Sequence, residues 1–174
     1  MSTLKEFTKE KHALAESQPF IKSIFENKVD TKKYTDYLYQ LYHVYFQLED
    51  HGKNLFKGVE EIKRHVYVLK DFIELVNGNN YKNVINPSTR QYLNYIWSIK
   101  DDNQKMLAHI YVRHMGDMFG GQQLKKLVPG SGRMYDFDNL PALIVAMRRK
   151  CGPELADEAN VAFDYNISII KDYN

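Results

Sequence analysis

The stretch RHMGDMFGGQQL, residues 113–124, places three glycines inside a sequence that otherwise has the spacing of a long helix. Each glycine in a helix interior costs roughly 1 kcal/mol relative to alanine, so Gly116, Gly120 and Gly121 together carry a penalty of about 3 kcal/mol. Gly116 and Gly120 lie four residues apart and Gly121 adjoins them, which leaves one helix face almost bare of side chains. Such a face allows another helix or a flat ligand to approach the backbone closely.

Polar residues flank this bare strip. Asp117 lies beside it, Arg113 is one turn earlier, and Tyr111 is further up the same helix. Helix–helix packing through small residues would explain the glycines, with Arg113 and Asp117 as a surface pair at i and i+4 that contributes about 0.2–0.5 kcal/mol. Packing does not need the acid, however, so a ligand site is the second explanation that the stretch supports.

The composition indicates a soluble globular protein. The 174 residues suffice for one domain, residues 1–174, with a sizeable core, and 44% of them are apolar. The net charge of +2 provides no basic field for a nucleic acid. Cys151 is the single cysteine, which excludes an intramolecular disulfide, and the N-terminus lacks the apolar core of a signal peptide. No run approaches the length of a membrane span, so we expect a cytoplasmic protein without a membrane anchor.

Helical spacing dominates the chain, and no alternating strand pattern persists for more than a few residues. The thirteen tyrosines suggest internal hydrogen-bond networks, because a buried tyrosine hydroxyl needs a polar partner. The sequence therefore predicts an all-α domain of about seven or eight helices. A first short helix ends before Pro19, a turn is expected at NGNNYKN, residues 77–83, and the other helices are expected over residues 31–56, 59–76, 87–100, 101–127, 139–150 and 154–172.

A second constellation lies in LKEFTKEKHALAES, residues 4–17. Lys5, Lys9, His12 and Glu16 follow one another at i, i+4, i+7 and i+11, which places them on one helix face. Glu16 could accept the Nδ1 proton of His12 and leave Nε2 free to bind a metal, while the lysines would meet an anionic ligand. A solvated amphipathic face with a surface histidine is the ordinary explanation of the same spacing. Taken with the glycine strip, however, the two faces suggest a flat metal-containing cofactor between them, and heme fits that description.

Both stretches resemble segments of the heme oxygenase family. LKEFTKEKHALAES is similar to the helix that supplies the proximal iron ligand in that family, and AHIYVRHMGDMFGGQQLKK, residues 108–126, resembles the distal helix. LYHVYFQLED and EANVAFDYNI also look like family segments and occur in the right order, so the resemblance extends from residue 4 to residue 170. The motif YxRxxGDxxGGQ, paired with the upstream KxxHxxxE, makes it specific.

This resemblance implies a fold and a reaction. The fold is a single all-α domain that holds heme between the proximal and distal helices. The reaction is the oxidative opening of heme to biliverdin with release of carbon monoxide and Fe²⁺, and we expect attack at the α-meso carbon. Heme is then both substrate and cofactor, and O₂ and an external reductant are required.

The resemblance also implies roles for individual residues. His12 should be the iron ligand, Glu16 its hydrogen-bond partner, and Lys5 and Lys9 should lie near the heme propionates. The kinked distal helix should form over heme with Gly116, Gly120 and Gly121. A water network near bound oxygen should be anchored by Asp117 and held by Tyr45, Tyr111 and Arg113. Of two late positions, Phe163 should line the pocket and Asn166 should support the network.

The expected chemistry accounts for the glycines. A strong acid–base side chain at the iron would promote cleavage of the O–O bond, whereas a wall of main chain avoids this and presses the oxygen toward the meso edge. Water held by Asp117 can then deliver a proton without direct contact. The ligand site would thus explain why the helix keeps three glycines that lower its stability.

Three positions depart from the family pattern. Phe119 stands where a small residue is usual, and it either narrows the pocket or turns outward. His114 replaces a usual aromatic residue and is expected to face away from the iron. On the penultimate helix, Arg148 or Arg149 should reach a propionate, while Ile144 occupies a position where a second cation is common, which weakens any prediction of how heme is oriented.

Two other functions compete with this one. A di-iron carboxylate bundle would need Glu-x-x-His motifs, and no histidine here has a glutamate three residues before it. A heme carrier would need His12 but not Asp117 together with Arg113 and Tyr45, so their presence favours catalysis. An acidic ferredoxin that docks on Lys5, Lys9 and Arg148 is the expected electron donor. A flavoprotein reductase is equally compatible, and a downstream bilin reductase is a further partner consistent with the activity.

Overall fold

The computed structural model describes residues 3–78 and 81–174, and within them the chain is helical with no β-strand, which confirms the predicted all-α class. Nine α-helices lie in these residues, more than expected, because α2 was not predicted and the glycine-bearing helix is divided in two. They are α1 (Leu4–Glu16), α2 (Pro19–Phe25), α3 (Thr31–His51), α4 (His65–Val76), α5 (Pro87–Ile99), α6 (Asn103–Ile110), α7 (Gly116–Leu124), α8 (Leu140–Lys150) and α9 (Ala156–Lys171).

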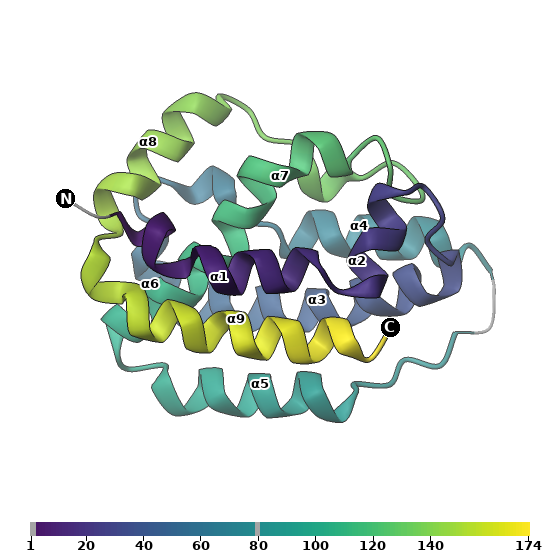
Figure 1. The fold of residues 1–174 in the computed structure, drawn as a ribbon, viewed down its shortest axis with the longest axis horizontal. Helices are drawn as coiled ribbons and strands as arrows, with labels where there is room; N and C mark the ends of the chain where they lie inside the picture. The colour runs from purple at the N-terminus through teal and green to yellow at the C-terminus, as the bar shows by residue number, and fades with distance from the viewer. Residues whose placement is uncertain (1–2, 79–80) are drawn as a thin grey trace.

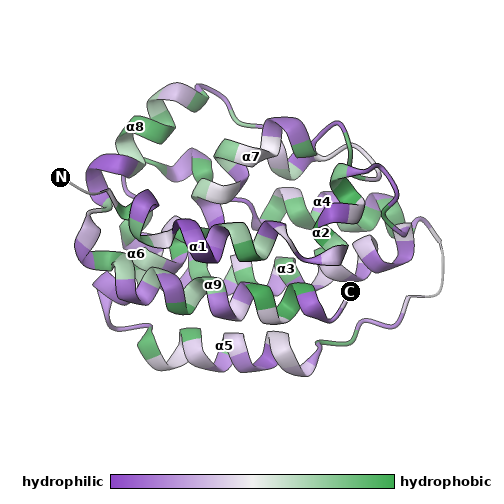
Figure 2. Ribbon diagram, in the orientation of Figure 1, coloured by the Kyte–Doolittle hydropathy of each residue, from purple (hydrophilic) through white to green (hydrophobic). Residues whose placement is uncertain are grey.

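The 21-residue helix α3 lies at the centre of the molecule and packs against α4, α5, α6 and α9 (Figure 1). Asp30 begins the helix by accepting a hydrogen bond from the Lys33 amide at 2.9 Å. Every helix carries both hydrophobic and hydrophilic residues along its length (Figure 2), as expected for helices that each bury one face. Ten residues of α3 are buried, so this helix supplies much of the core.

The first and last helices lie side by side (Figure 1). Helix α1 starts with a capping box, in which the Thr3 hydroxyl accepts from the Glu6 amide and the Glu6 carboxylate accepts from the Thr3 amide. It ends at Glu16, in agreement with the predicted stop before Pro19, which begins α2 instead. This arrangement brings side chains from the two ends of the chain to one place.

A π-helical turn, Tyr111–Met115, joins α6 to α7. Helical spacing predicted one continuous helix over residues 101–127, kinked according to the family resemblance, and the structure divides it into α6, the π turn and α7. A π turn pairs residues at i and i+5 and thereby inserts one residue into the helix. Since one residue corresponds to about 100° of rotation, the insertion sets the direction in which Gly116 and Asp117 point.

The predicted helix over residues 59–76 is shorter in the structure. Residues 53–56 and 60–62 form 3₁₀ turns, and regular helix begins at His65. Gly58 between the turns has φ +80°, which a regular helix does not allow. The Arg64 guanidinium, which donates only to backbone carbonyls, holds this segment against residues 134–136.

Helix α4 ends at Val76, and the predicted turn over residues 77–83 begins at its C-cap, Asn77, although residues 79 and 80 of that turn lie outside the described part. None of the helices in residues 3–78 and 81–174 combines the length and apolar character that a bilayer span requires.

Candidate functional site

A cavity of about 530 Å³ lies between α1, α3, α7 and α9, within the usual size range of small-molecule sites. Its walls are mostly apolar, and several lining residues are themselves exposed, which marks its open side. Both sequence constellations contribute to it, because α1 forms one wall and α7 another. The cavity is therefore the candidate site.

The predicted polar face of α1 lines this cavity with Lys5, Lys9, His12 and Glu16. The His12 imidazole is half exposed and lies edge-on to the Phe163 ring of α9, with ring centroids 6.0 Å apart. One detail of the prediction is wrong: Nε2, not Nδ1, is the His12 atom near Glu16. The separation of 3.6 Å is too long for a hydrogen bond, so the imidazole is held mainly by packing.

On α7, two of the three glycines present bare main chain to the cavity. A Cβ atom built on Gly116 would meet no atom within 4 Å, and one on Gly120 would meet only the end of Leu124, at 4.0 Å. Gly121 has a different role, because a Cβ there would lie 2.5 Å from the Tyr135 ring. The expectation that Gly121 faces the ligand is therefore corrected: this glycine lets Tyr135 pack against the helix.

The inner wall of the cavity holds a closed group of polar side chains. The Tyr45 hydroxyl donates to Asp117 Oδ2, and Arg113 Nε donates to that same hydroxyl at 3.0 Å. Arg113 also donates to Asn166 Oδ1 at 2.9 Å and approaches Asp117 Oδ1 at 3.5 Å. Four residues predicted for the distal network are thus together, and the Arg113–Asp117 pair joins a partly buried guanidinium to a buried carboxyl, unlike a surface pair.

Burial is the largest single influence on the pKa values of Asp117, Tyr45 and Arg113. It raises the pKa of the Asp117 carboxyl, although Arg113 and the Tyr45 hydroxyl oppose the shift. Burial also raises the pKa of the Tyr45 hydroxyl, and Asp117 adds to that effect. For Arg113, burial disfavours the charge, but Tyr45 and Asp117 outweigh it and raise the guanidinium pKa. The group is therefore a buried cation facing a carboxyl that can exchange a proton.

Two residues predicted for the network differ in whether they bond within this group and in whether they reach the cavity. Tyr111 is half-buried and lines the cavity, but it makes no hydrogen bond to another described side chain, so its predicted part in holding the network is not seen. Tyr45 has the opposite placement: it is fully buried behind Asp117 and does not line the cavity itself.

The open side of the cavity carries Phe119, whose ring is 47% exposed. Lys5 Nζ lies 5.9 Å from the ring centroid and the Arg148 guanidinium lies 5.1 Å from it. Phe119 thus joins α1, α7 and α8 at the rim. Arg148 and Ile144 do not line the cavity itself, and the Arg148 guanidinium lies at the rim, beside Phe119.

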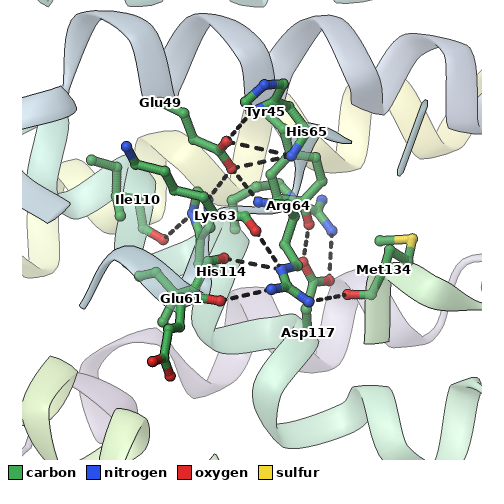
Figure 3. A network of polar contacts seen from close by, with 12 residues as sticks. Tyr45, Glu49, Glu61, Lys63, Arg64, His65, Ile110, His114, Asp117 and Met134 are labelled. Carbon is green, nitrogen blue, oxygen red and sulfur yellow. Dashed lines mark hydrogen bonds and ion pairs between the residues drawn. The ribbon is translucent and has the colours of Figure 1, made fainter. Parts of the chain in front are cut away.

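His114 faces away from the cavity, as expected. It is fully buried, with Nε2 2.9 Å from Glu49 Oε1 of α3 and Nδ1 3.1 Å from the Ile110 carbonyl oxygen (Figure 3). It is therefore no candidate for an iron ligand on the distal side.

Sequence reasoning did not assign several cavity residues. The inner end is lined by three tyrosines, two of them from α3, and by apolar side chains; the set includes Tyr34, Tyr37, Tyr135, Ile24 and Leu41. The sequence signal that could have pointed to these residues is the high number of tyrosines in the chain. Which of the thirteen tyrosines reach the cavity depends on how α3 packs, which their spacing alone does not fix.

The site fits heme in its shape and in its donor groups. His12 offers one imidazole, and a single axial histidine suffices because the porphyrin supplies the other ligands of the iron. Gly116 faces open space, as a flat ring requires, and Lys5 and Lys9 pair with no described carboxylate. The buried Tyr34 hydroxyl has no hydrogen-bond partner among the described residues, and a bound ligand or water would provide one.

Comparisons with known proteins agree with this geometry. The family model described as heme oxygenase matches residues 1–140. A heme oxygenase of Guillardia theta is 32% identical, with 97% of this chain and 84% of that protein covered, and one of Porphyra purpurea is 30% identical, with 98% and 85% covered.

Solved structures show the same fold. Heme oxygenase-1 of the cyanobacterium Synechocystis, in complex with heme, superposes with a TM-score of 0.86 at 24% identity and covers 97% of this chain and 89% of its own. The heme oxygenase of Leptospira interrogans gives 0.85 at 24% identity, with 97% of each chain covered. On the strength of the matched family model and of relatives aligned over nearly its whole length, the chain belongs to the heme oxygenase family and is a heme-degrading oxidoreductase.

Proposed function

We propose that this protein binds heme between α1 and α7 and opens it at the α-meso carbon, giving biliverdin, carbon monoxide and Fe²⁺. The observation that carries the proposal is the pairing of one exposed imidazole, His12, with bare main chain at Gly116 and Gly120 across one cavity. When bound, heme supplies the iron that activates dioxygen and the carbon that is oxidised. The side chains and main chain of this protein bind and orient the ring and hold the proton source.

On α1, His12 is the proposed axial ligand and Glu16 its neighbour. The imidazole forms no hydrogen bond to a described residue, so both ring nitrogens are accessible to a ligand on one side and to Glu16 or water on the other. A carboxylate near a ligating histidine fixes the ring and increases its basicity. Because Glu16 lies 3.6 Å from Nε2, it would take that role either on Nε2, with Nδ1 left for the iron, or on Nδ1 after a flip of the ring.

On α7, the main chain at Gly116 and Gly120 shapes the distal wall. Because neither residue has a side chain, this wall would place no acid or base next to the distal face of the ligand. It also leaves open space above Gly116, where a side chain would otherwise lie. The glycines would therefore influence which position of the ring is attacked. The proton source lies behind this wall, at Asp117.

The proposed proton source is water held by Asp117. Its Oδ2 accepts from Tyr45, while Oδ1 has only the distant Arg113 contact at 3.5 Å, so this oxygen has capacity to accept from a water in the cavity. The raised pKa of Asp117 favours proton exchange at that oxygen. Arg113 and Asn166 keep the carboxyl in position.

The propionates are assigned to the open side. Lys5 and Lys9 are exposed cations on the cavity wall, and the Arg148 guanidinium reaches the rim beside Phe119. Contacts there would fix the rotation of the ring in its plane and thereby which meso carbon is attacked. We infer attack at the α-meso carbon from the family to which the chain belongs, and isomer analysis of the biliverdin tests it directly.

The same exposed cations are the proposed docking surface for an acidic ferredoxin, the proposed electron donor. A flavoprotein reductase could supply the electrons in its place. Replacing Lys5 and Lys9 by glutamate should slow ferredoxin-supported turnover more than turnover with ascorbate, because only the protein donor must dock. The cytoplasm is the proposed compartment, and a bilin reductase is the class of enzyme that would consume the product.

The deciding experiment adds hemin, then ascorbate in air. Loss of the Soret band together with the growth of biliverdin absorption supports the proposal. A Soret band that persists under reducing conditions would identify a heme carrier instead. Loss of the band without biliverdin would mean nonspecific bleaching and would equally contradict the proposal.

A further inference from the structure

The Glu49–His114 pair lies behind the site and belongs to no part of the proposed function. The two residues come from α3 and from the π-helical turn, 65 positions apart, and both are buried (Figure 3). His114 also lies edge-on to Tyr45, with ring centroids 5.1 Å apart, so the pair adjoins the Asp117 network. A buried polar pair at this place needs an explanation.

The hydrogen-bond partners of the His114 imidazole indicate where its protons lie. Its Nδ1 faces the Ile110 carbonyl oxygen at 3.1 Å, which can only accept, so Nδ1 carries a proton. Its Nε2 lies 2.9 Å from Glu49 Oε1, and one proton must lie between these atoms as well. The imidazole is therefore held at both ring nitrogens, by Glu49 and by the Ile110 carbonyl oxygen, and a phenylalanine ring could make neither contact.

The Glu49 carboxylate is held from three directions. It accepts from the Arg64 amide at 2.5 Å, and from the His65 amide and ring, at the start of α4. No side chain of α4 itself caps these amides, so Glu49 acts as the missing cap. Its position is therefore fixed by α3 and α4, and His114 is attached to an anchored group.

The contact to Ile110 lies where regular helix gives way to the π turn. Ile110 is the last residue of α6, and backbone pairing changes from i+4 to i+5 immediately after it. The ring nitrogen that donates to this carbonyl ties a side chain of the turn to the last residue of α6. Removing the inserted residue from the turn would rotate α7 by about 100° relative to α6.

We propose that His114, anchored by Glu49, is a positioning residue that stabilises the π-helical turn and so directs Asp117 and the bare glycine face of α7 toward the cavity. His114 is adjacent to Arg113 and three residues before Asp117, so the turn that it holds carries two members of the network. The inference rests on the proposed role of Asp117.

The test compares His114→Phe, which keeps an aromatic ring but loses both polar contacts, with His114→Gln, which keeps a donor that can reach Glu49. His65→Phe is the matched control, because it removes the other imidazole on Glu49 without altering the turn. We expect His114→Phe to lower the biliverdin formed per heme consumed by about 2- to 30-fold. His114→Gln should recover most of the loss, and the control should stay within about two-fold of the parent.

Two further measurements separate positioning from general destabilisation. In the heme-free protein, amide hydrogen exchange over residues 106–118 should accelerate in His114→Phe and not in His65→Phe. In a double-mutant cycle, His114→Phe should cause little additional loss of biliverdin yield when Asp117 is already asparagine, because both changes act on one network. Additive losses, or exchange over 106–118 that stays unchanged, would overturn the inference.

The outcome for Asp117 alone distinguishes the two proposals. If Asp117→Asn gives normal biliverdin, the proposed function of the network is wrong whatever His114 does. If Asp117→Asn is defective while His114→Phe is normal in yield and exchange, only the positioning role of His114 is wrong.

Discussion

The Tyr45 hydroxyl on α3 donates a hydrogen bond to Asp117 Oδ2 on α7, across 72 positions of sequence and at the inner wall of the cavity. Arg113 donates to the same hydroxyl, so Tyr45 links the cation to the carboxyl. Arg113 and Asp117 are i,i+4 neighbours, and their shared contact with Tyr45 holds the two side chains in one orientation. Loss of the carboxyl and loss of the hydroxyl should therefore have different consequences.

Asp117→Asn should bind hemin but form biliverdin roughly 100-fold more slowly, because the amide cannot exchange the proton that the carboxyl relays through water. Tyr45→Phe should have the smaller effect, since Arg113 still holds the carboxyl. Its free energy of unfolding should fall by about 1–3 kcal/mol through the lost hydrogen bond to a charged group. Hemin titration, single-turnover assays and urea unfolding measure these quantities, and equal rates for Asp117→Asn and the parent would contradict the assignment.

The pH dependence of stability should have opposite signs at two buried carboxyls. Burial raises the pKa of Asp117 in the folded protein, so this group contributes instability that grows as pH rises from the unfolded pKa, about 4, toward the folded one. Burial also acts to raise the pKa of Glu49, but hydrogen bonds from His114, Arg64 and His65 outweigh it and lower the pKa. Glu49 therefore contributes stability above its unfolded pKa, and this contribution is lost as pH falls through the folded value.

Urea unfolding between about pH 3 and pH 7 tests this contrast. The stability of Asp117→Asn relative to the parent should increase with pH, whereas that of Glu49→Gln should decrease with pH. A tenfold difference in proton affinity between the folded and unfolded protein corresponds to about 1.4 kcal/mol in the free energy of unfolding. Slopes of the same sign for both variants would show that one of the two directions is wrong.

Replacing His12 by alanine should remove the axial ligand. We expect the absorption spectrum of the hemin complex to change and biliverdin formation to fall below detection, while the circular dichroism of the heme-free protein stays unaltered because this side chain is half exposed. His51→Ala is the matched control, since His51 is a partly exposed histidine outside the cavity. An unchanged hemin spectrum in His12→Ala would remove this residue from the site.

The glycines of α7 should respond differently to alanine. At Gly116 the new methyl group meets open space, so the heme-free protein should gain about 0.5–1 kcal/mol from helix propensity, while hemin binding or biliverdin yield falls. At Gly121 the methyl group would lie 2.5 Å from the Tyr135 ring, so the protein should lose about 1–3 kcal/mol from overpacking. Thermal unfolding of both heme-free variants checks the signs. A Gly116→Ala variant that is both more stable and fully active would mean that no ligand contacts this backbone.

The local parts of this structure could be read from the sequence because helical periodicity is a short-range property. The i,i+4 and i,i+7 spacing placed Lys5, Lys9 and His12 on one face, and the structure confirms that these residues line one cavity wall. The same logic identified Gly116 and Gly120 as bare main chain beside Asp117. The resemblance to a family then supplied Tyr45 and Asn166, which no spacing rule connects to the others.

Other features were decided only by packing in three dimensions. Gly121 has the same local sequence signal as Gly120, yet it faces Tyr135, because the π turn and the path of residues 133–135 determine which side of α7 meets which neighbour. His114 pairs with Glu49 for the same reason. The chain by itself thus determined its helices and which side chains share a helix face, since these follow from backbone geometry. The tertiary structure alone decided how α7 is rotated against α3, because one inserted residue in a helix has no periodic signature and its cost is offset only by contacts between distant segments.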